Sequence, residues 1–235
     1  MLKTEDIRQI IINKYNNNDF RIIGNNVQES KTIEIQNAHF IVDKPYIIRK
    51  PDYDYYYKEK EWYDRQSLNV NDIPGGAPKM WLKCADKYGN INSNYGWCIY
   101  SEENGQQFKK CAERLLEDPH TREAIMIYNR PSMQYEYNKG GMHDFMCCQN
   151  MQYFINDYDE YTNVIDCIVN FRSNDAVFGF NNDALWCHDV LVNLVKELND
   201  KYYKKYGKWL AEGTIYWNAG SLHVYEKHFK YLKNG

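Results

Sequence analysis

One stretch of twenty residues holds several of the side chains that could do chemistry. Residues 170–189 read NFRSNDAVFGFNNDALWCHD, in which Arg172 and Ser173 are followed by the carboxylates Asp175 and Asp183. An arginine beside a serine can bind an anion, and a carboxylate held at one place can accept or transfer a proton. The types and spacing of these residues therefore indicate a site for a small anionic ligand.

The segments on either side of this stretch must position it. Residues 164–171 form a mostly apolar, β-branched run typical of a buried strand, which puts Arg172 and Ser173 at the strand's end. Downstream, Cys187, Val190 and Leu194 recur at helical spacing. Asp183 is therefore predicted to lie at or just before the N-terminus of a helix, where a ligand would also meet backbone amides.

The remaining elements are predicted from periodicity and from turn residues. We expect a helix from Thr4, two strands within residues 31–48 separated by a turn at 43–45, a helix within 53–69, a helix through Leu116 ended by Asp118 and Pro119, a strand at 124–128, a sheet-like stretch at 143–155, and strands at 213–216 and 221–225 separated by a turn at 218–220. In the last strand His223 and Tyr225 would share a face and could bind a hydroxyl group. Glu59 lies on the helix at 53–69, where exposure is its simplest interpretation.

Composition limits the class of protein. The chain has 235 residues without a linker-like segment, so a single domain over residues 1–235 is expected. Its 29 basic and 32 acidic residues give a net charge of −3, which argues against a nucleic-acid-binding face. No run is apolar enough to span a membrane and the start does not resemble a signal peptide, so we expect a cytoplasmic protein. Seven cysteines without a CxxC pair indicate neither a disulfide framework nor a zinc site.

Several motifs occur in the order typical of one enzyme family. They are ExxW from Glu59, a tryptophan at Trp81, YG at Tyr95 and Gly96, DPxTR ending at Arg122, Cys147 five residues before Gln152, RSxD from Arg172 to Asp175, Gly179, and HxYxxH from His223. Each motif is weak alone, whereas the ordered set is specific. The chain resembles the thymidylate synthase superfamily over nearly its whole length, and within it the deoxycytidylate hydroxymethylases of bacteriophages.

This resemblance implies a fold and a reaction. The fold would be a single α+β domain with a mixed β-sheet and flanking helices, dimerising through the sheet. The reaction would convert dCMP, 5,10-methylenetetrahydrofolate and water into 5-hydroxymethyl-dCMP and tetrahydrofolate, without a metal. The sequence ends without the apolar tail by which thymidylate synthases seal the folate site, which fits an enzyme that admits water.

The resemblance also implies roles for individual residues. Cys147 would add as a thiolate to carbon 6 of the pyrimidine, which makes carbon 5 nucleophilic. Arg172 would lower the pKa of this thiol and bind the phosphate. The other implied roles are substrate binding by Ser173 and Gln152, phosphate binding across the dimer by Arg122, proton relay by Glu59 with Tyr95, folate contacts by Trp81, Asp175 and Gly179, binding of the 3′-hydroxyl by His223 and Tyr225, and recognition of the cytosine edge by Asp183.

Simpler interpretations and two departures remain beside these roles. A lone cysteine is most often a buried inert thiol, and Asp183 directly before a helix could be only an N-cap. The histidine that usually follows the nucleophile is replaced by Cys148, and Glu123 stands where the family has a second arginine. The alternatives are a hydroxymethylase acting on dUMP, a thymidylate synthase-type methylase, and a silent nucleotide-binding or mRNA-binding regulator.

Overall fold

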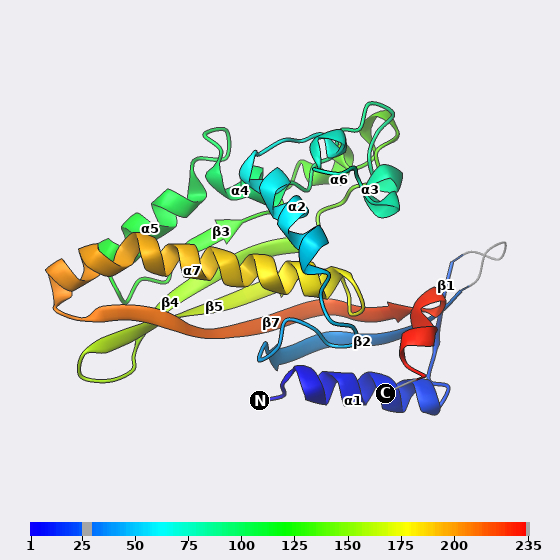
Figure 1. The fold of residues 1–235 in the computed structure, drawn as a ribbon, viewed down its shortest axis with the longest axis horizontal. Helices are drawn as coiled ribbons and strands as arrows, with labels where there is room; N and C mark the ends of the chain where they lie inside the picture. The colour runs from blue at the N-terminus through cyan, green and yellow to red at the C-terminus, as the bar shows by residue number, and fades with distance from the viewer. Residues whose placement is uncertain (25–29, 234–235) are drawn as a thin grey trace.

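The computed structural model describes residues 1–24 and 30–233 (Figure 1). The longest elements are a 28-residue helix and a 17-residue strand, which lie alongside each other. In chain order the elements are α1 (Thr4–Asn16), β1 (Arg21–Ile23), β2 (Ser30–Ile41), α2 (Tyr53–Asp64), η1 (Val70–Asp72), α3 (Lys79–Cys84), α4 (Tyr95–Tyr100), α5 (Gln107–Glu117), β3 (Ile125–Ile127), α6 (Met133–Glu136), η2 (Lys139–Gly141), β4 (Cys148–Asp157), β5 (Thr162–Phe171), β6 (Asn174–Asp175), α7 (Gly179–Tyr206), β7 (Trp209–Tyr225) and η3 (Glu226–Tyr231).

The strands form one mixed sheet. Their order is β1-β2-β7-β5-β4-β3, and the short β6 also pairs with β7. Strand β7 runs parallel to β5 and β6, whereas β2 pairs with β7, and β4 with β5, in the antiparallel sense. Parallel neighbours need a crossover connection, and α7 supplies it between β5 and β7. The predicted α+β fold with a mixed sheet and flanking helices is confirmed.

The core lies between the sheet and α7. Alternate residues of β5 from Asn163 to Phe171 are buried, as are most of the apolar residues of α7. The intervening residues of β5 are only partly buried, which leaves the other face of this strand less covered. Helix α2 contacts both α4 and α7 (Figure 1). Among the described residues, no helix has the length and apolar character needed to cross a membrane.

Helix α4 approaches α2 closely because of one glycine. A Cβ atom at Gly96 would lie 1.9 Å from the carbonyl oxygen of Tyr63, a distance that no side chain could occupy. Stacking of Tyr63 on Tyr95 accompanies this contact, with ring centroids 5.3 Å apart. Gly96 therefore permits the packing that brings Tyr95 toward the start of α7.

Two of the predicted strand boundaries are wrong. Residues 46–48 do not form a second strand; instead, Arg8 donates hydrogen bonds to the carbonyl oxygens of Ile47 and Ile48. The predicted turn at 218–220 is part of the continuous strand β7. Asn218 is held in that strand because its side chain donates to Asn170 of β5. Tertiary hydrogen bonds thus override the local preference of Asn and Gly for turns.

The predicted start of the long helix is also wrong. Helix α7 begins at Gly179, so Asp183 lies in its second turn and is not the N-cap residue. Two asparagines in the first turn of α7 have tertiary partners: Asn181 donates to the carbonyl of Arg49, and Asn182 donates to Glu59. The end of the sequence, where no apolar tail was expected to seal the folate site, includes residues 234–235, which lie outside the described residues.

Candidate active site

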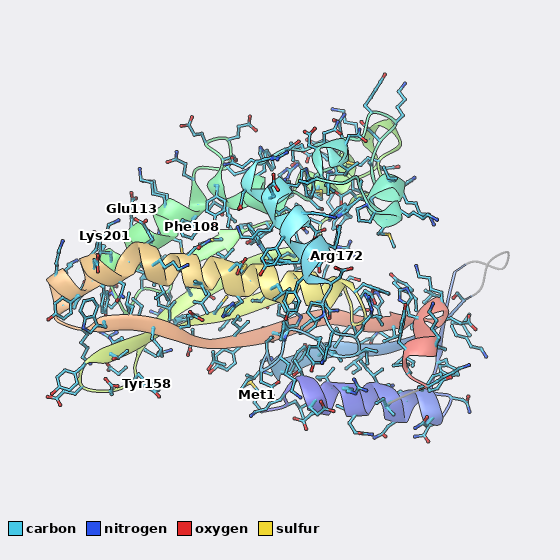
Figure 2. The ribbon with its side chains drawn as sticks, viewed as in Figure 1. Met1, Phe108, Glu113, Tyr158, Arg172 and Lys201 are labelled. Carbon is cyan, nitrogen blue, oxygen red and sulfur yellow. The ribbon has the colours of Figure 1, made fainter. Side chains whose placement is uncertain are left out.

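Cys147 and Arg172 meet where two strands of the sheet begin and end. Cys147 directly precedes β4 and Arg172 directly follows β5. The backbone amide of Arg172 donates to the carbonyl of Cys147 at 2.9 Å, and its guanidinium lies 3.6 Å from the Cys147 sulfur. The same guanidinium donates to the carbonyl of Met146 at 3.0 Å and stacks over the Phe145 ring. Backbone contacts therefore hold this cation beside the thiol. Figure 2 labels the position of Arg172 in the fold.

The charge state of Cys147 is balanced between opposing effects. Burial raises the pKa of its thiol to about 11, the positive charge of Arg172 opposes this, and the carboxylate of Asp183 adds to the increase. The thiol is therefore mostly protonated at neutral pH in the free protein. Neutralising Asp183 would favour the thiolate, which is the nucleophilic form. Cys148 lies within β4 and is only 1% exposed, so it has no comparable access.

Glu59 is buried, which its position on α2 did not reveal. It is 4% exposed, and burial raises the pKa of its carboxyl group. Three side chains donate to it: Tyr55 at 2.7 Å, Trp81 at 2.8 Å and Asn182 at 2.9 Å. These bonds satisfy the buried carboxyl and fix its orientation. A carboxyl group with a raised pKa in such a setting is suited to accept and return protons.

Asp183 is the second carboxyl group of the cluster. Asn174 donates to its Oδ2 atom at 2.7 Å, and Tyr95 also forms a hydrogen bond with it. Burial, and then the negative charge of Glu59, raise the pKa of Asp183 to about 8. Its neighbour on α7, Asn182, donates to Glu59, so α7 links the two carboxyl groups of the site. At neutral pH a substantial share of Asp183 is therefore protonated.

The raised pKa predicts a pH-dependent cost of keeping Asp183. Since its pKa increases from 3.8 to about 8 in the folded chain, ionisation destabilises the fold progressively across that interval. Asp183→Asn has a side chain of nearly the same shape that does not ionise. We expect the variant to gain stability relative to the wild type as pH rises from about 5 to about 8, with no further gain above that. Urea unfolding of both proteins across this range would measure it; a constant difference would contradict the assignment.

Strands β6 and β7 bring a third group of predicted residues together. Asp175 is the register partner of His223, and the amide of Ala176 donates to the His223 carbonyl. His223 is 8% exposed, and burial lowers its pKa although Asp175 opposes this effect, so its imidazole is neutral at pH 7. The ring of Tyr225 lies on the same face, with centroids 4.7 Å apart. A neutral imidazole beside a phenol can bind a sugar hydroxyl.

Two residues predicted to contact folate, Trp81 and Gly179, lie beside Glu59 and Asp175 respectively. Trp81, on α3, donates to Glu59 and packs edge-on against Trp62 at 5.5 Å. Gly179 is the first residue of α7, where a Cβ atom would lie 3.5 Å from the Cβ of Asp175. Ser173 is partly buried in the segment between Arg172 and β6.

Two predicted residues lie apart from the cluster within a single chain. Arg122 is exposed beside β3 in a hollow of about 540 Å³, where Lys110 and Arg114 add positive charge and Glu123 a negative charge. Gln152, on β4, donates to the carbonyl of Arg122 at 2.8 Å. The fold therefore places Arg122 and Gln152 outside the hydrogen-bonded group around Glu59 and Asp183, and their predicted roles stay predictions.

Three polar residues of the cluster were not identified from the sequence. Tyr55 lies one turn before Glu59 on α2, so helical spacing alone could have indicated it. Asn174 and Asn182 carried no such signal, because their partners are distant in the sequence or on another element. Across residues 1–24 and 30–233 there is no group of three or more His, Cys, Asp and Glu side chains suited to a metal ion.

The site thus combines a thiol, an arginine, the buried Glu59 and the partly buried Asp183 at one end of a mixed sheet. The thymidylate synthase family model aligns with residues 6–235. The chain therefore belongs to the thymidylate synthase family.

Its similarity to phage enzymes is higher than to the cellular relatives that were found. It is 49% identical to the deoxycytidylate 5-hydroxymethyltransferase of Enterobacteria phage T4 over 203 residues, which cover 85% of this chain and 78% of that enzyme. The enzyme of the same name from phage T6 matches equally. A putative thymidylate synthase of Methanocaldococcus jannaschii is 29% identical over 135 residues, covering 57% of this chain and 54% of that protein.

Proposed function

We propose that this chain is a hydroxymethyltransferase that converts dCMP to 5-hydroxymethyl-dCMP with methylenetetrahydrofolate and water. The observation that carries the proposal is Asp183, a carboxyl group whose pKa of about 8 lets it be protonated at neutral pH. A protonated carboxyl group donates one hydrogen bond and accepts another, which matches the N3 acceptor and amine donor of cytosine. The 49% identity to phage enzymes named for this reaction supports the same assignment.

The site residues suit the successive demands of this reaction. Cys147 adds to carbon 6, with Arg172 at 3.6 Å stabilising the thiolate that attacks. Asp183 holds the cytosine edge, while His223 and Tyr225 bind the 3′-hydroxyl. Glu59, oriented by its three donors, moves protons and aligns the water that adds to the exocyclic methylene. Elimination of Cys147 then restores the aromatic base and releases the product.

The surroundings of Asp175 fit a folate. Methylenetetrahydrofolate, when bound, supplies the one-carbon unit for carbon 5. Asp175 can accept hydrogen bonds from ring N–H groups, and the buried Nδ1 of His228, 3.9 Å away, has no hydrogen-bond partner among the described residues. The Phe178 ring, 36% exposed, lies nearby with Arg49 over it at 5.0 Å. A flat heteroaromatic ring with an anionic tail suits these groups.

We also propose a homodimer that shares its active sites. On the less covered face of the sheet, side chains of four adjacent strands form a hydrogen-bonded row: His39, Asn218, Asn170 and Asn150. Gln152 belongs to the same side of β4 and holds the backbone of Arg122. Pairing of this face with a second copy would cover the row and bring Arg122 toward the phosphate site of the partner. The enzyme would act in the cytoplasm, in the host cell if a phage encodes it.

Product analysis tests the reaction directly. The protein is incubated with methylenetetrahydrofolate and either dCMP or dUMP. Dihydrofolate formation is followed by absorbance, and the mass of the nucleotide product is measured by mass spectrometry. We expect dCMP to gain the mass of one CH₂O unit without formation of dihydrofolate. A product heavier by only CH₂, together with dihydrofolate, would indicate a methylase. Absence of any product from either nucleotide would favour a silent binding protein.

The choice of base should depend on Asp183. Uracil places its O4 acceptor against the carboxyl oxygen that would receive the cytosine amine, and an unpaired acceptor in a closed site costs about 1–3 kcal/mol. Asp183→Asn offers an amide donor to O4 instead. We expect the dCMP:dUMP ratio of kcat/KM to move toward dUMP by on the order of tenfold to a hundredfold. A wild type that prefers dUMP, or a variant with unchanged preference, would refute this role.

A further inference from the structure

The side chain of Asn174 donates one hydrogen bond to Asp183, and its carbonyl oxygen is buried without a hydrogen-bond partner among the described residues. The residue lies on β6 and is 3% exposed. Its Nδ2 atom donates to Oδ2 of Asp183 at 2.7 Å, whereas its own Oδ1 atom is buried without a hydrogen-bond partner among the described residues. A buried carbonyl without a partner is costly, so its retention calls for an explanation. Among the described residues, Asp183 is the one hydrogen-bond partner of this side-chain amide.

The contact distinguishes the two oxygens of Asp183. An amide NH₂ group can only donate, so an oxygen that receives it favours the acceptor form and disfavours carrying a proton. When Asp183 is protonated, the proton is therefore directed to Oδ1. Tyr95 does not make the same selection, because a hydroxyl group can rotate to donate or accept. Four other titratable groups face this carboxyl: Glu59, Asp175, Cys147 and Cys148. A negative charge on any of them makes Asp183 harder to ionise.

This asymmetry matches one pyrimidine edge and not the other. Cytosine needs a donor at N3 and an acceptor for its amine, which Oδ1–H and the second lone pair of Oδ2 can provide together. Uracil needs the reverse, an acceptor at N3 and a donor at O4. Supplying that donor requires the proton on Oδ2, where it would oppose the Asn174 NH₂ group.

We propose that Asn174 is a positioning residue that fixes the proton of Asp183 on Oδ1 and thereby makes the site select cytosine over uracil. This inference rests on the proposed function, since it concerns the same carboxyl group. The proposal gives Asn174 a function that can offset the cost of burying its Oδ1 atom without a hydrogen-bond partner among the described residues. Loss of the amide would leave the Asp183 proton free to occupy either oxygen.

The test uses Asn174→Leu, which keeps roughly the same volume but cannot form a hydrogen bond. We expect the dCMP:dUMP ratio of kcat/KM to fall by about tenfold, and the alkaline limb of the dCMP pH profile to move to higher pH, since the Asn174 bond lowers the pKa of Asp183. A matched control is Asn182→Leu, which removes a bond to Glu59 instead. It should reduce turnover of both nucleotides and leave their ratio unchanged.

A second background separates positioning from a structural role. In an Asp183→Ala protein there is no carboxyl proton to place and no side-chain group to orient, so adding Asn174→Leu should leave the base preference within about twofold. If Asn174 had only a structural role, Asn174→Leu would lower kcat/KM for dCMP and dUMP equally in either background. That result would overturn the proposal.

A variant that keeps the shape of the side chain guards against misfolding. If Asn174→Leu does not fold, Asn174→Asp serves, because it offers an acceptor to Oδ2 and should shift preference toward dUMP; an unchanged ratio would overturn the proposal. An active wild type with an unaffected Asn174 variant would refute this inference alone. A wild type that converts neither nucleotide would refute the proposed function, and the inference with it.

Discussion

We expect Cys147→Ser to abolish covalent trapping by 5-fluoro-dCMP and to lower turnover by roughly 10³-fold or more. Trapping requires a nucleophile at carbon 6, and only a thiolate forms this adduct readily near neutral pH. Although burial raises the pKa of Cys147 to about 11, Arg172 lies 3.6 Å from its sulfur and can stabilise the anion as it forms. A serine hydroxyl at this position would be far harder to ionise. Intact-protein mass spectrometry with methylenetetrahydrofolate and the fluorinated nucleotide would count the adduct.

Its neighbour provides a matched control. Cys148 is 1% exposed within β4, and burial raises the pKa of its thiol well above the ordinary value. We expect Cys148→Ala to retain stoichiometric trapping, with any loss confined to stability because a buried side chain is shortened. If Cys148→Ala instead prevented the adduct while Cys147→Ser allowed it, the assignment of the nucleophile by its spacing to Gln152 would be shifted by one residue.

We expect two inactive variants to restore each other. Arg122 is exposed beside β3, and its proposed role is to bind phosphate in the active site of the partner chain. A homodimer of Arg122→Ala should therefore be inactive, because both of its phosphate sites lack this arginine. Mixed with Cys147→Ser, it forms heterodimers in which one site has both residues intact. With random exchange, half of the dimers are mixed and half of their sites are complete, so recovery should approach about a quarter of wild-type activity.

The mixing experiment needs evidence that subunits exchange. Differently tagged chains can be unfolded together, refolded and separated, and native mass spectrometry then counts the mixed dimers. Mixed dimers without activity would show that Arg122 serves its own chain or none. A matched control is Arg114→Ala, which removes a second cation from the same hollow. If Arg114 has no role at the phosphate, that variant should remain active without a partner.

The family, the fold class and the residues able to do chemistry could be predicted from the sequence alone. The ordered motifs predicted the family and the α+β class, and the match over residues 6–235 confirms both. The buried strand at 164–171 was also predicted correctly, because a β-branched apolar run with a polar end has few other solutions. Local patterns succeed where the requirement is local: a strand buried on one face, or a helix ended by Asp118 and Pro119.

Only the tertiary structure decided the state of the two carboxyl groups. Glu59 occupies a helix position that spacing assigns to solvent, yet it is buried because Asn182, 123 residues away, packs against it and donates to it. Asp183 was predicted to lie at or just before the N-terminus of the helix, but α7 starts four residues earlier and places it opposite Asn174. No local pattern encodes such pairings, since each depends on which elements the sheet brings together.

The continuous strand β7 illustrates the same division. Asn218 and Gly220 are local turn formers, and from the sequence alone a turn is the expected outcome. In the folded chain Asn218 joins the hydrogen-bonded row across the sheet, and a Cβ atom at Gly220 would lie 2.9 Å from the carbonyl oxygen of Arg172. The sequence therefore specified which side chains could act, whereas the packing of β7 against β5 and β6 determined which of them meet, because burial and hydrogen bonding between distant residues outweigh local preference.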